Sequence, residues 1–183
     1  EEVRRYLMTH FGGEQVLTGG LTVHTSLDLD DQIAAWRALR KGLRDHDRRM
    51  GYRGSIRNVP KNEWPALMAE IGASNAAVAP GEDALVQGLV IEVDDAAQKL
   101  SLALGPGGRT SLGIADVNWA GPVNPARDGV VARVSRVGQA LHAGDLVYLE
   151  RLEAGAEGEA ARFALYQRPL AEGSLIAVDL EKA

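Results

Sequence analysis

Two periods of apolar residues divide this chain into segments. Residues 1–11 carry apolar side chains at helical spacing, with acidic residues first and basic residues following, which predicts a short helix. Glycine pairs at 12–13 and 19–20 predict a flexible connection, because glycine tolerates positive φ and is costly to order. Residues 21–27 alternate between apolar and polar side chains, so we predict a strand with one apolar face.

A long amphipathic helix is predicted directly after this strand. Asp28 has the side chain of an N-cap residue, and the aspartates that follow suit the positive end of a helix dipole. Gly51 is expected to end the helix, because glycine readily takes the left-handed conformation found there. The apolar stripe at helical spacing comprises Leu29, Ile33, Trp36, Leu39 and Leu43.

The next part of the chain predicts a short helix and then a β-module. Residues 60–73 have a small apolar face at helical spacing, with Asn62 as the expected N-cap. Residues 130–145 fit a helix or a strand equally well, and one helical turn is expected near Asp116. Five short strands with an irregular excursion after the third predict a small Greek-key barrel of the OB type. The predicted strands are 85–94, 99–104, 109–114, 145–152 and 161–170.

The last apolar run, residues 175–180, predicts a strand that needs cover on both faces. We expect it to pair with residues 21–27, because the ends of an inserted domain generally lie close together. The predicted fold class is α+β and mainly β, with an OB-like small Greek-key barrel inserted between a strand–helix segment and a return strand. The predicted divisions are a linker from an upstream domain (1–20), the strand and helix (21–58), the OB-like insert with its leading helix (59–172) and the return strand (173–183).

Composition narrows the functional classes. The chain has 183 residues, 45% of them hydrophobic and only 5% aromatic, which suits an aliphatic core. A formal net charge of −5 argues against a general nucleic-acid binder, because such proteins carry a basic excess that displaces counterions from phosphate. Cysteine is absent, which excludes disulfides and thiolate chemistry. No stretch reaches the roughly 20 apolar residues of a membrane helix, and the chain starts at Glu1, so we expect a piece whose anchor or export signal lies upstream.

The residues with catalytic or metal-binding chemistry do not form a recognisable site. A nucleophilic serine needs a base beside it, and none of the serines has a lysine three residues later or lies in a G-x-S-x-G motif. Asp28, Asp30 and Asp31 lack the glycine and glutamate that complete an EF-hand loop, so the helix-cap interpretation is preferred. We therefore predict no catalytic residue, no metal site and no cofactor.

The basic run at residues 44–54 is the most distinctive local feature. Arg48, Arg49 and Arg53 surround Tyr52 at the end of the predicted long helix. One interpretation is a solvated helix end that complements the dipole. The other is an interdomain contact, in which arginines pair with carboxylates of a neighbouring domain. Trp119, in the β-module, is a further candidate for contact with an oligosaccharide.

The order of these segments resembles a known family. GGLTVHTSLDLDDQIAAWRAL followed by DHDRRMGYRG is similar to the segment that joins the glycosyltransferase and transpeptidase domains of class A (bifunctional) penicillin-binding proteins. LVQGLVIEVDD, SLGIADVNWAGP, LHAGDLVYLE and FALYQRPLAEGSLIAVD resemble the OB-like docking insert of the 1A-like members and its return strand. Each string is weak alone, but their order and spacing together are fairly specific.

The resemblance implies a non-catalytic docking module. The family's Ser-x-x-Lys, Ser-x-Asn and Lys-Thr/Ser-Gly elements are absent, as are its glycosyltransferase glutamate motifs, so no catalytic residue carries over. The implied parent polymerises lipid II and cross-links peptidoglycan on the periplasmic side of the inner membrane. The implied partners are the flanking glycosyltransferase and transpeptidase domains, and an outer-membrane lipoprotein activator or peptidoglycan. The alternative is a free-standing OB-type binder of oligosaccharide or nucleic acid, although no nucleic acid is expected.

Overall fold

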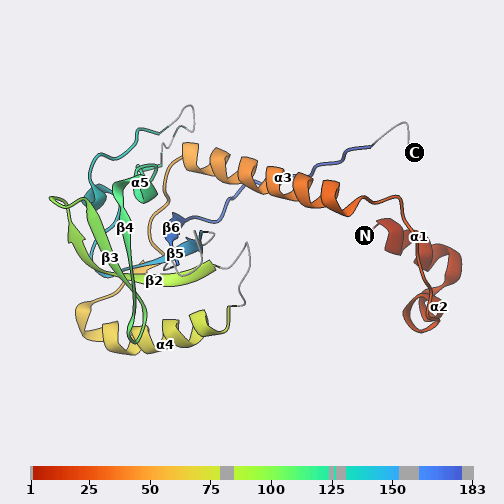
Figure 1. Ribbon diagram of the computed structural model, residues 1–183, viewed down its shortest axis with the longest axis horizontal. Helices are drawn as coiled ribbons and strands as arrows, with labels where there is room; N and C mark the ends of the chain where they lie inside the picture. Colours follow the sequence, from red (N-terminus) through yellow and green to blue (C-terminus); the bar gives the residue numbers. More distant parts are fainter. Residues whose placement is uncertain (1, 79–84, 124–125, 127–130, 153–160, 179–183) are drawn as a thin grey trace. The chain divides into compact units, whose positions relative to one another are not determined.

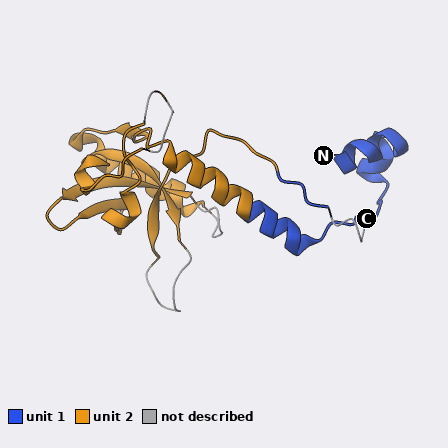
Figure 2. Cartoon of the chain, turned by 90° about the horizontal axis from the view of Figure 1, so that it is seen from above, with its two compact units in different colours: residues 1–37, 175–183 blue, residues 38–174 orange. Residues whose placement is uncertain are grey.

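The computed structural model describes two compact units. One contains residues 1–37 and 175–183, and the other contains residues 38–174 (Figure 2). Within the described part of the chain, no helix is long and apolar enough to cross a membrane. The residues described are 2–78, 85–123, 126, 131–152 and 161–178.

The first unit begins with the predicted helix, followed by a second one. Helix α1 (Glu2–Phe11) agrees with the prediction. The expected flexible connection is wrong in part, because residues 13–18 form helix α2 (Gly13–Thr18). Between the glycine pairs, Glu14, Gln15 and Leu17 have high helix propensity. Neither helix contains a buried residue.

The two predicted flanking strands are not formed among the described residues. Residues 21–27 and 171–178 have no strand assignment, and residues 179–180 of the predicted return strand lie outside the described part of the chain. A strand needs a neighbour to satisfy its backbone N–H and C=O groups, and neither segment has one in the described residues. The alternation of apolar and polar residues is present at 21–27, but no described strand pairs with either segment.

Helix α3 (Leu29–Arg49) begins and ends as predicted. Asp28 Oδ1 accepts hydrogen bonds from the backbone N–H groups of Asp30, at 3.0 Å, and Asp31, at 3.2 Å. The helix ends just before Gly51, whose φ of 96° lies in the left-handed region. Residues 38–49 of this helix belong to the second unit, and the rest belongs to the first.

The second unit is built on an antiparallel sheet of six strands (Figure 1). Strand β5 pairs with β2 along one edge and with β1 and β6 along the other, while β2 pairs with β3 and β3 with β4. The five predicted strands are all present, although the last is shorter than the predicted 161–170. The sixth, β1, is too short for any periodicity to reveal. The strands are β1 (Arg57–Asn58), β2 (Leu85–Asp94), β3 (Lys99–Gly105), β4 (Gly108–Gly113), β5 (Asp145–Arg151) and β6 (Phe163–Tyr166).

This pairing gives the OB-like topology, but the sheet is open. In the OB arrangement, the first long strand pairs with the second and the fourth, and the third closes the barrel against the fifth. Strands β4 and β6 approach each other, yet no backbone ladder joins them among the described strands. The prediction of an α+β, OB-like module is therefore correct, whereas a barrel fully closed by hydrogen bonds is not observed.

The main core contains residues from strands β2 to β6. Leu100, Leu102, Leu112 and Leu149 are all completely buried there. Helix α5 (Ile114–Val117), the helical turn predicted near Asp116, supplies a buried valine. The ambiguous stretch after residue 130 is irregular where described, with one 3₁₀ turn, η2 (Val137–Gln139), and it buries Val137.

A second core lies between the sheet and helix α4 (Trp64–Ala76), which crosses β2 and β3 (Figure 1). Gly72 allows this contact, because a Cβ atom there would meet Pro106 Cδ at 2.6 Å. Asn75 fixes the end of the helix by hydrogen bonds with the backbone of Gln87 and Leu104. Asn62 is not the N-cap, because it lies inside the 3₁₀ turn η1 (Lys61–Glu63) that precedes α4.

Candidate interaction site at the C-terminal end of helix α3

The turn after helix α3 is held against the segment that follows α5. Gly51 is buried, and a Cβ atom at this position would lie 2.9 Å from Val123 Cα. The backbone N–H of Tyr52 donates to Gly121 O at 2.7 Å, and the N–H of Val131 donates to Arg49 O at 3.0 Å. Replacing this glycine would strain the backbone as well as the packing, since the conformation is left-handed.

Three of the predicted interaction residues form one aromatic and cationic cluster. The Trp119 and Tyr52 rings meet edge to face, with centroids 5.7 Å apart. The Arg48 guanidinium lies 5.1 Å from the centre of the Trp119 ring, which is cation–π geometry. Burial raises the pKa of the Tyr52 hydroxyl above its usual range, and the nearby Asp145 carboxylate adds to this shift. The Trp119 Nε1 atom is buried and has no hydrogen-bond acceptor among the described residues.

A buried carboxylate organises the other side of the helix end. Asp47 is only 5% exposed. Its Oδ1 atom accepts from Arg53 Nη1 at 2.7 Å and from the backbone N–H of Leu170 at 3.4 Å, and its Oδ2 atom accepts from Gln167 Nε2 at 2.7 Å. Arg53 also donates through Nη2 to the Arg168 carbonyl. These bonds connect helix α3 to the chain that leaves strand β6.

Two further contacts hold this junction to the sheet. The Arg44 guanidinium forms a part-buried ion pair with Glu150 of strand β5. The buried Asp145, at the start of the same strand, accepts from Ser55 Oγ at 3.0 Å and from Asn58 Nδ2 at 2.9 Å. Both the helix end, through Arg44, and the segment after it, through Ser55 and Asn58, are therefore bonded to strand β5.

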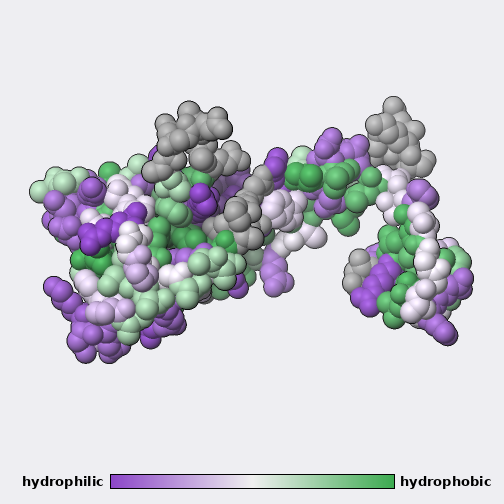
Figure 3. All heavy atoms as spheres, turned by 60° about the horizontal axis from the view of Figure 1, so that its bottom comes forward, coloured by the Kyte–Doolittle hydropathy of each residue, from purple (hydrophilic) through white to green (hydrophobic). Residues whose placement is uncertain are grey.

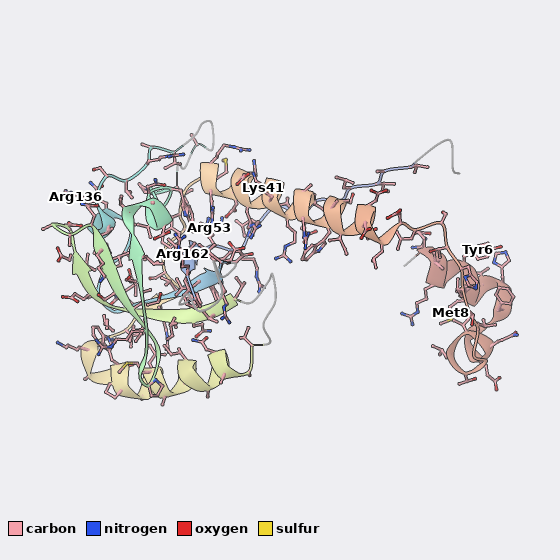
Figure 4. The ribbon with its side chains drawn as sticks, viewed as in Figure 1. Tyr6, Met8, Lys41, Arg53, Arg136 and Arg162 are labelled. Carbon is pink, nitrogen blue, oxygen red and sulfur yellow. The ribbon has the colours of Figure 1, made fainter. Side chains whose placement is uncertain are left out.

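The structure brings only some of the predicted interaction residues together. Arg48, Tyr52 and Trp119 come together, and Arg53 lies in the Asp47 network near the end of α3 (Figure 4). Arg49 is exposed, and its carbonyl accepts the hydrogen bond from the Val131 N–H. Their role in binding a partner stays a prediction.

Asp47, Gln167 and Glu150 were not among the residues predicted from the sequence. One signal was available, because a carboxylate in the last turn of a helix opposes the dipole and needs a specific cation. Gln167 and Glu150 carried no local signal. Each has a structural role only because the fold brings it to a residue of α3, Gln167 to Asp47 and Glu150 to Arg44.

Two hollows flank the end of α3 within the second unit. One has a volume of about 320 Å³ and is lined by His46, Asp47, Met50, Arg53, Val123 and Leu170, among others. The other has a volume of about 440 Å³ and is lined by Arg40, Leu43, Tyr166, Pro169, Glu172 and Gly173, among others. No group of acidic residues and histidines in the described residues has the arrangement of a metal site.

Residues 52–171 match the family described as the penicillin-binding protein OB-like domain. The chain belongs to this family. The matched region begins at Tyr52, directly after helix α3, and ends two residues before Gly173. The Asp47 network therefore joins the helix to both ends of the family domain.

The curated relatives are penicillin-binding proteins 1A. The protein from Rickettsia felis is 30% identical over 180 residues, which is 98% of this chain and 19% of the relative. The protein from Rickettsia typhi is 36% identical over 110 residues, covering 58% of this chain and 13% of the relative. The crystal structure of penicillin-binding protein 1A from Haemophilus influenzae superposes with a TM-score of 0.58 at 25% identity, covering 92% of this chain and 22% of that one.

The chain is thus the OB-like segment of a class A penicillin-binding protein of the 1A type. It spans about a fifth of the length of the relatives it matches.

Proposed function

We propose that this chain is the non-catalytic interdomain module of a bifunctional peptidoglycan synthase. In this proposal, the parent protein polymerises lipid II and cross-links peptidoglycan on the periplasmic side of the inner membrane. The family match and the penicillin-binding relatives support the assignment. The module's own contribution is to set the position of the flanking glycosyltransferase and transpeptidase domains.

The observation that carries this proposal is the Asp47 network. It lies where the chain enters the OB-like module through α3 and where the chain leaves it after β6. Gly173 lies beside Leu39 and Leu43, so the outgoing chain runs along the helix. Two connections that leave a domain side by side transmit its orientation better than two separate flexible links do.

The chemistry of the junction favours a fixed geometry over a flexible one. A buried carboxylate is costly unless it is paired, and Asp47 is paired with a cation and two further donors. Any rotation of α3 against the sheet would separate Asp47 from Gln167 and Arg44 from Glu150. The penalty for such a motion keeps the helix at one angle to the module.

The positioning role is tested in the full-length parent protein. We expect Asp47→Ala to leave glycan polymerisation measurable but to lower the fraction of cross-linked product, because the two catalytic domains lose their fixed relation. Lys41→Ala is the matched control, since Lys41 forms only an exposed pair with Asp45 on the same helix. Cross-linking equal to wild type in a folded Asp47→Ala protein would contradict the positioning role.

The non-catalytic assignment has a separate test. A fluorescent β-lactam should label the full-length parent covalently but leave this 183-residue chain unlabelled. Label on the chain itself would show that it contains a reactive serine and would overturn the assignment.

A protein partner is a second proposal. The Arg48, Tyr52 and Trp119 cluster combines aromatic and guanidinium groups, which are enriched in the energetic centres of protein interfaces. We propose that an activator such as an outer-membrane lipoprotein contacts this cluster. A photo-crosslinker at Trp119 of the parent should capture that lipoprotein in intact cells. Capture only from the exposed control position Arg57, on strand β1, would contradict the proposal.

A further inference from the structure

A third hollow is lined by residues of strands β3 and β4, helix α5 and the start of β6. It has a volume of about 550 Å³, within the range of small-ligand sites, and it opens where strands β4 and β6 lack a joining ladder. Arg162, labelled in Figure 4, is at the β6 side of this opening, and the facing side is formed by β3 and β4. Figure 3 shows one face of the module coloured by hydropathy.

The hollow combines cations with hydroxyl groups. Three cations line it: Lys99 from β3, Arg109 from β4 and Arg162 just before β6. Three hydroxyl side chains line it as well, namely Ser101, Thr110 and Ser111. Ser101 and Ser111 are direct partners in the β3–β4 register, so their hydroxyls lie next to each other on one face.

The cations are not matched by carboxylates within the described residues. None of the three has an ion pair there. The one acidic residue of the lining, Asp116, already accepts from the backbone N–H of Gly113 at 2.8 Å through Oδ2. Glu92, beside the hollow, accepts from Ser101 Oγ at 3.3 Å. The site therefore retains an excess of positive charge in a chain whose formal net charge is −5.

This lining suits a sugar chain that carries carboxylates. The centre of a protein–protein contact is usually apolar and aromatic, whereas only Ala161 and Phe163 are apolar here. Single-stranded nucleic acid needs a row of stacking aromatics, and Phe163 is alone and packs partly against the core. Neighbouring hydroxyls can both donate to and accept from sugar hydroxyls, and unpaired arginines bind carboxylates through paired N–H donors.

We propose that this hollow binds a carboxylate-bearing glycan, namely an uncross-linked peptidoglycan strand with its acidic stem peptides. Arg109 and Arg162 bind carboxylates from the two sides of the opening, and Ser101 and Ser111 bind the sugar hydroxyls between them. The inference rests on the proposed function, because that function supplies the glycan.

The test measures binding of short uncross-linked glycan strands with tetrapeptide stems to this chain by calorimetry. We expect saturable binding that weakens on the order of tenfold in the double variant Arg109→Ala/Arg162→Ala, since two charge-assisted contacts are lost. Arg57→Ala is the matched control, because Arg57 is also exposed but lies on β1, outside the hollow. Thermal unfolding of each variant verifies that the module remains folded.

Three further ligands distinguish the alternatives. A neutral chitin oligosaccharide should bind more weakly than the acidic strand and respond less to the double variant. Equal binding of polyglutamate or a thymidine oligonucleotide would overturn the proposal in favour of a general anion surface or a nucleic-acid site. Absence of glycan binding would also overturn it. The positioning role is tested independently, by cross-linking in the Asp47→Ala parent protein.

Discussion

The two units of this chain use the same kind of apolar residue in opposite ways. In residues 38–174, leucines such as Leu102, Leu112 and Leu149 are completely buried. In the first unit no described residue is buried, and Leu27, Leu29 and Ile176 are 62%, 65% and 88% exposed. Figure 3 shows apolar and hydrophilic patches beside each other along the part of α3 that belongs to this unit.

The difference shows that an apolar pattern along the chain does not by itself lead to burial. Helix α3 has a clear apolar stripe, yet its only buried residue is the aspartate Asp47, near its C-terminal end. An amphipathic pattern that finds no core in its own unit marks a surface suited to another partner. We propose that this partner is a flanking catalytic domain of the parent protein.

The largest effect is expected in the core of the second unit. Leu102→Ala should lower the free energy of unfolding by about 3 kcal/mol, because it removes buried apolar surface and leaves a cavity. Leu29→Ala, the same change at an exposed position, should alter it by less than about 0.5 kcal/mol. Urea denaturation of both variants measures the contrast, and similar losses would show that the first unit has a core of its own.

A smaller effect is expected where α3 meets the sheet. Asp47→Ala should cost about 2 kcal/mol, because Arg53 Nη1 loses its carboxylate acceptor and Gln167 Nε2 loses one of its two acceptors in a part-buried site. Asp45→Ala, on the same helix, removes only an exposed ion pair and should cost less than about 0.5 kcal/mol. If both variants unfold at the same temperature, the Asp47 network does not hold this junction.

The aromatic cluster predicts a loss of stability at high pH. The folded-state pKa of Tyr52 is raised, so above about pH 10 the unfolded chain ionises this hydroxyl while the folded chain does not. The stability contribution is complete below the unfolded pKa and is lost as the pH rises through the folded one. Between about pH 8 and pH 11, wild type should lose about 1 kcal/mol more than Tyr52→Phe. Parallel pH profiles would mean that water reaches the hydroxyl.

The smallest effect is expected on the exposed face of α3. Ile33 is 38% exposed, so Ile33→Gln should change the unfolding of this chain by less than about 0.5 kcal/mol. Ile71→Gln, in the buried face of α4, is the matched control and should cost about 3 kcal/mol. In the full-length parent, Ile33→Gln should lower the unfolding temperature measurably, and no change there would argue against a covering domain.

Local signals made most of the elements predictable from the sequence. The bounds of β2 and α3 follow from periodicity and from Asp28 at the helix start, since these depend only on neighbouring residues. The predicted strands at 21–27 and 175–180 failed where described for the complementary reason. Alternation indicates which face would be apolar, but a strand exists only where another strand satisfies its backbone.

The candidate sites depended on contacts that no local pattern records. The sequence indicated the arginine-rich helix end, and Trp119 as a separate candidate, but not that Arg48 covers the indole ring. Asp47 and Gln167 are separated by 120 residues, so their pairing follows from the sheet register and from the path of the chain after β6. The polar hollow depends in the same way on how far β4 and β6 remain apart.

The sequence by itself determined the OB-like order of strands, the helix before it and the absence of the catalytic motifs of its family. Those properties reside in residue type and spacing along the chain. Only the tertiary structure decided that the sheet stays open between β4 and β6, that a buried aspartate joins the incoming helix to the outgoing chain, and that Lys99, Arg109 and Arg162 share one hollow. These features arise from long-range packing, whose energy depends on distances that the order of residues does not specify.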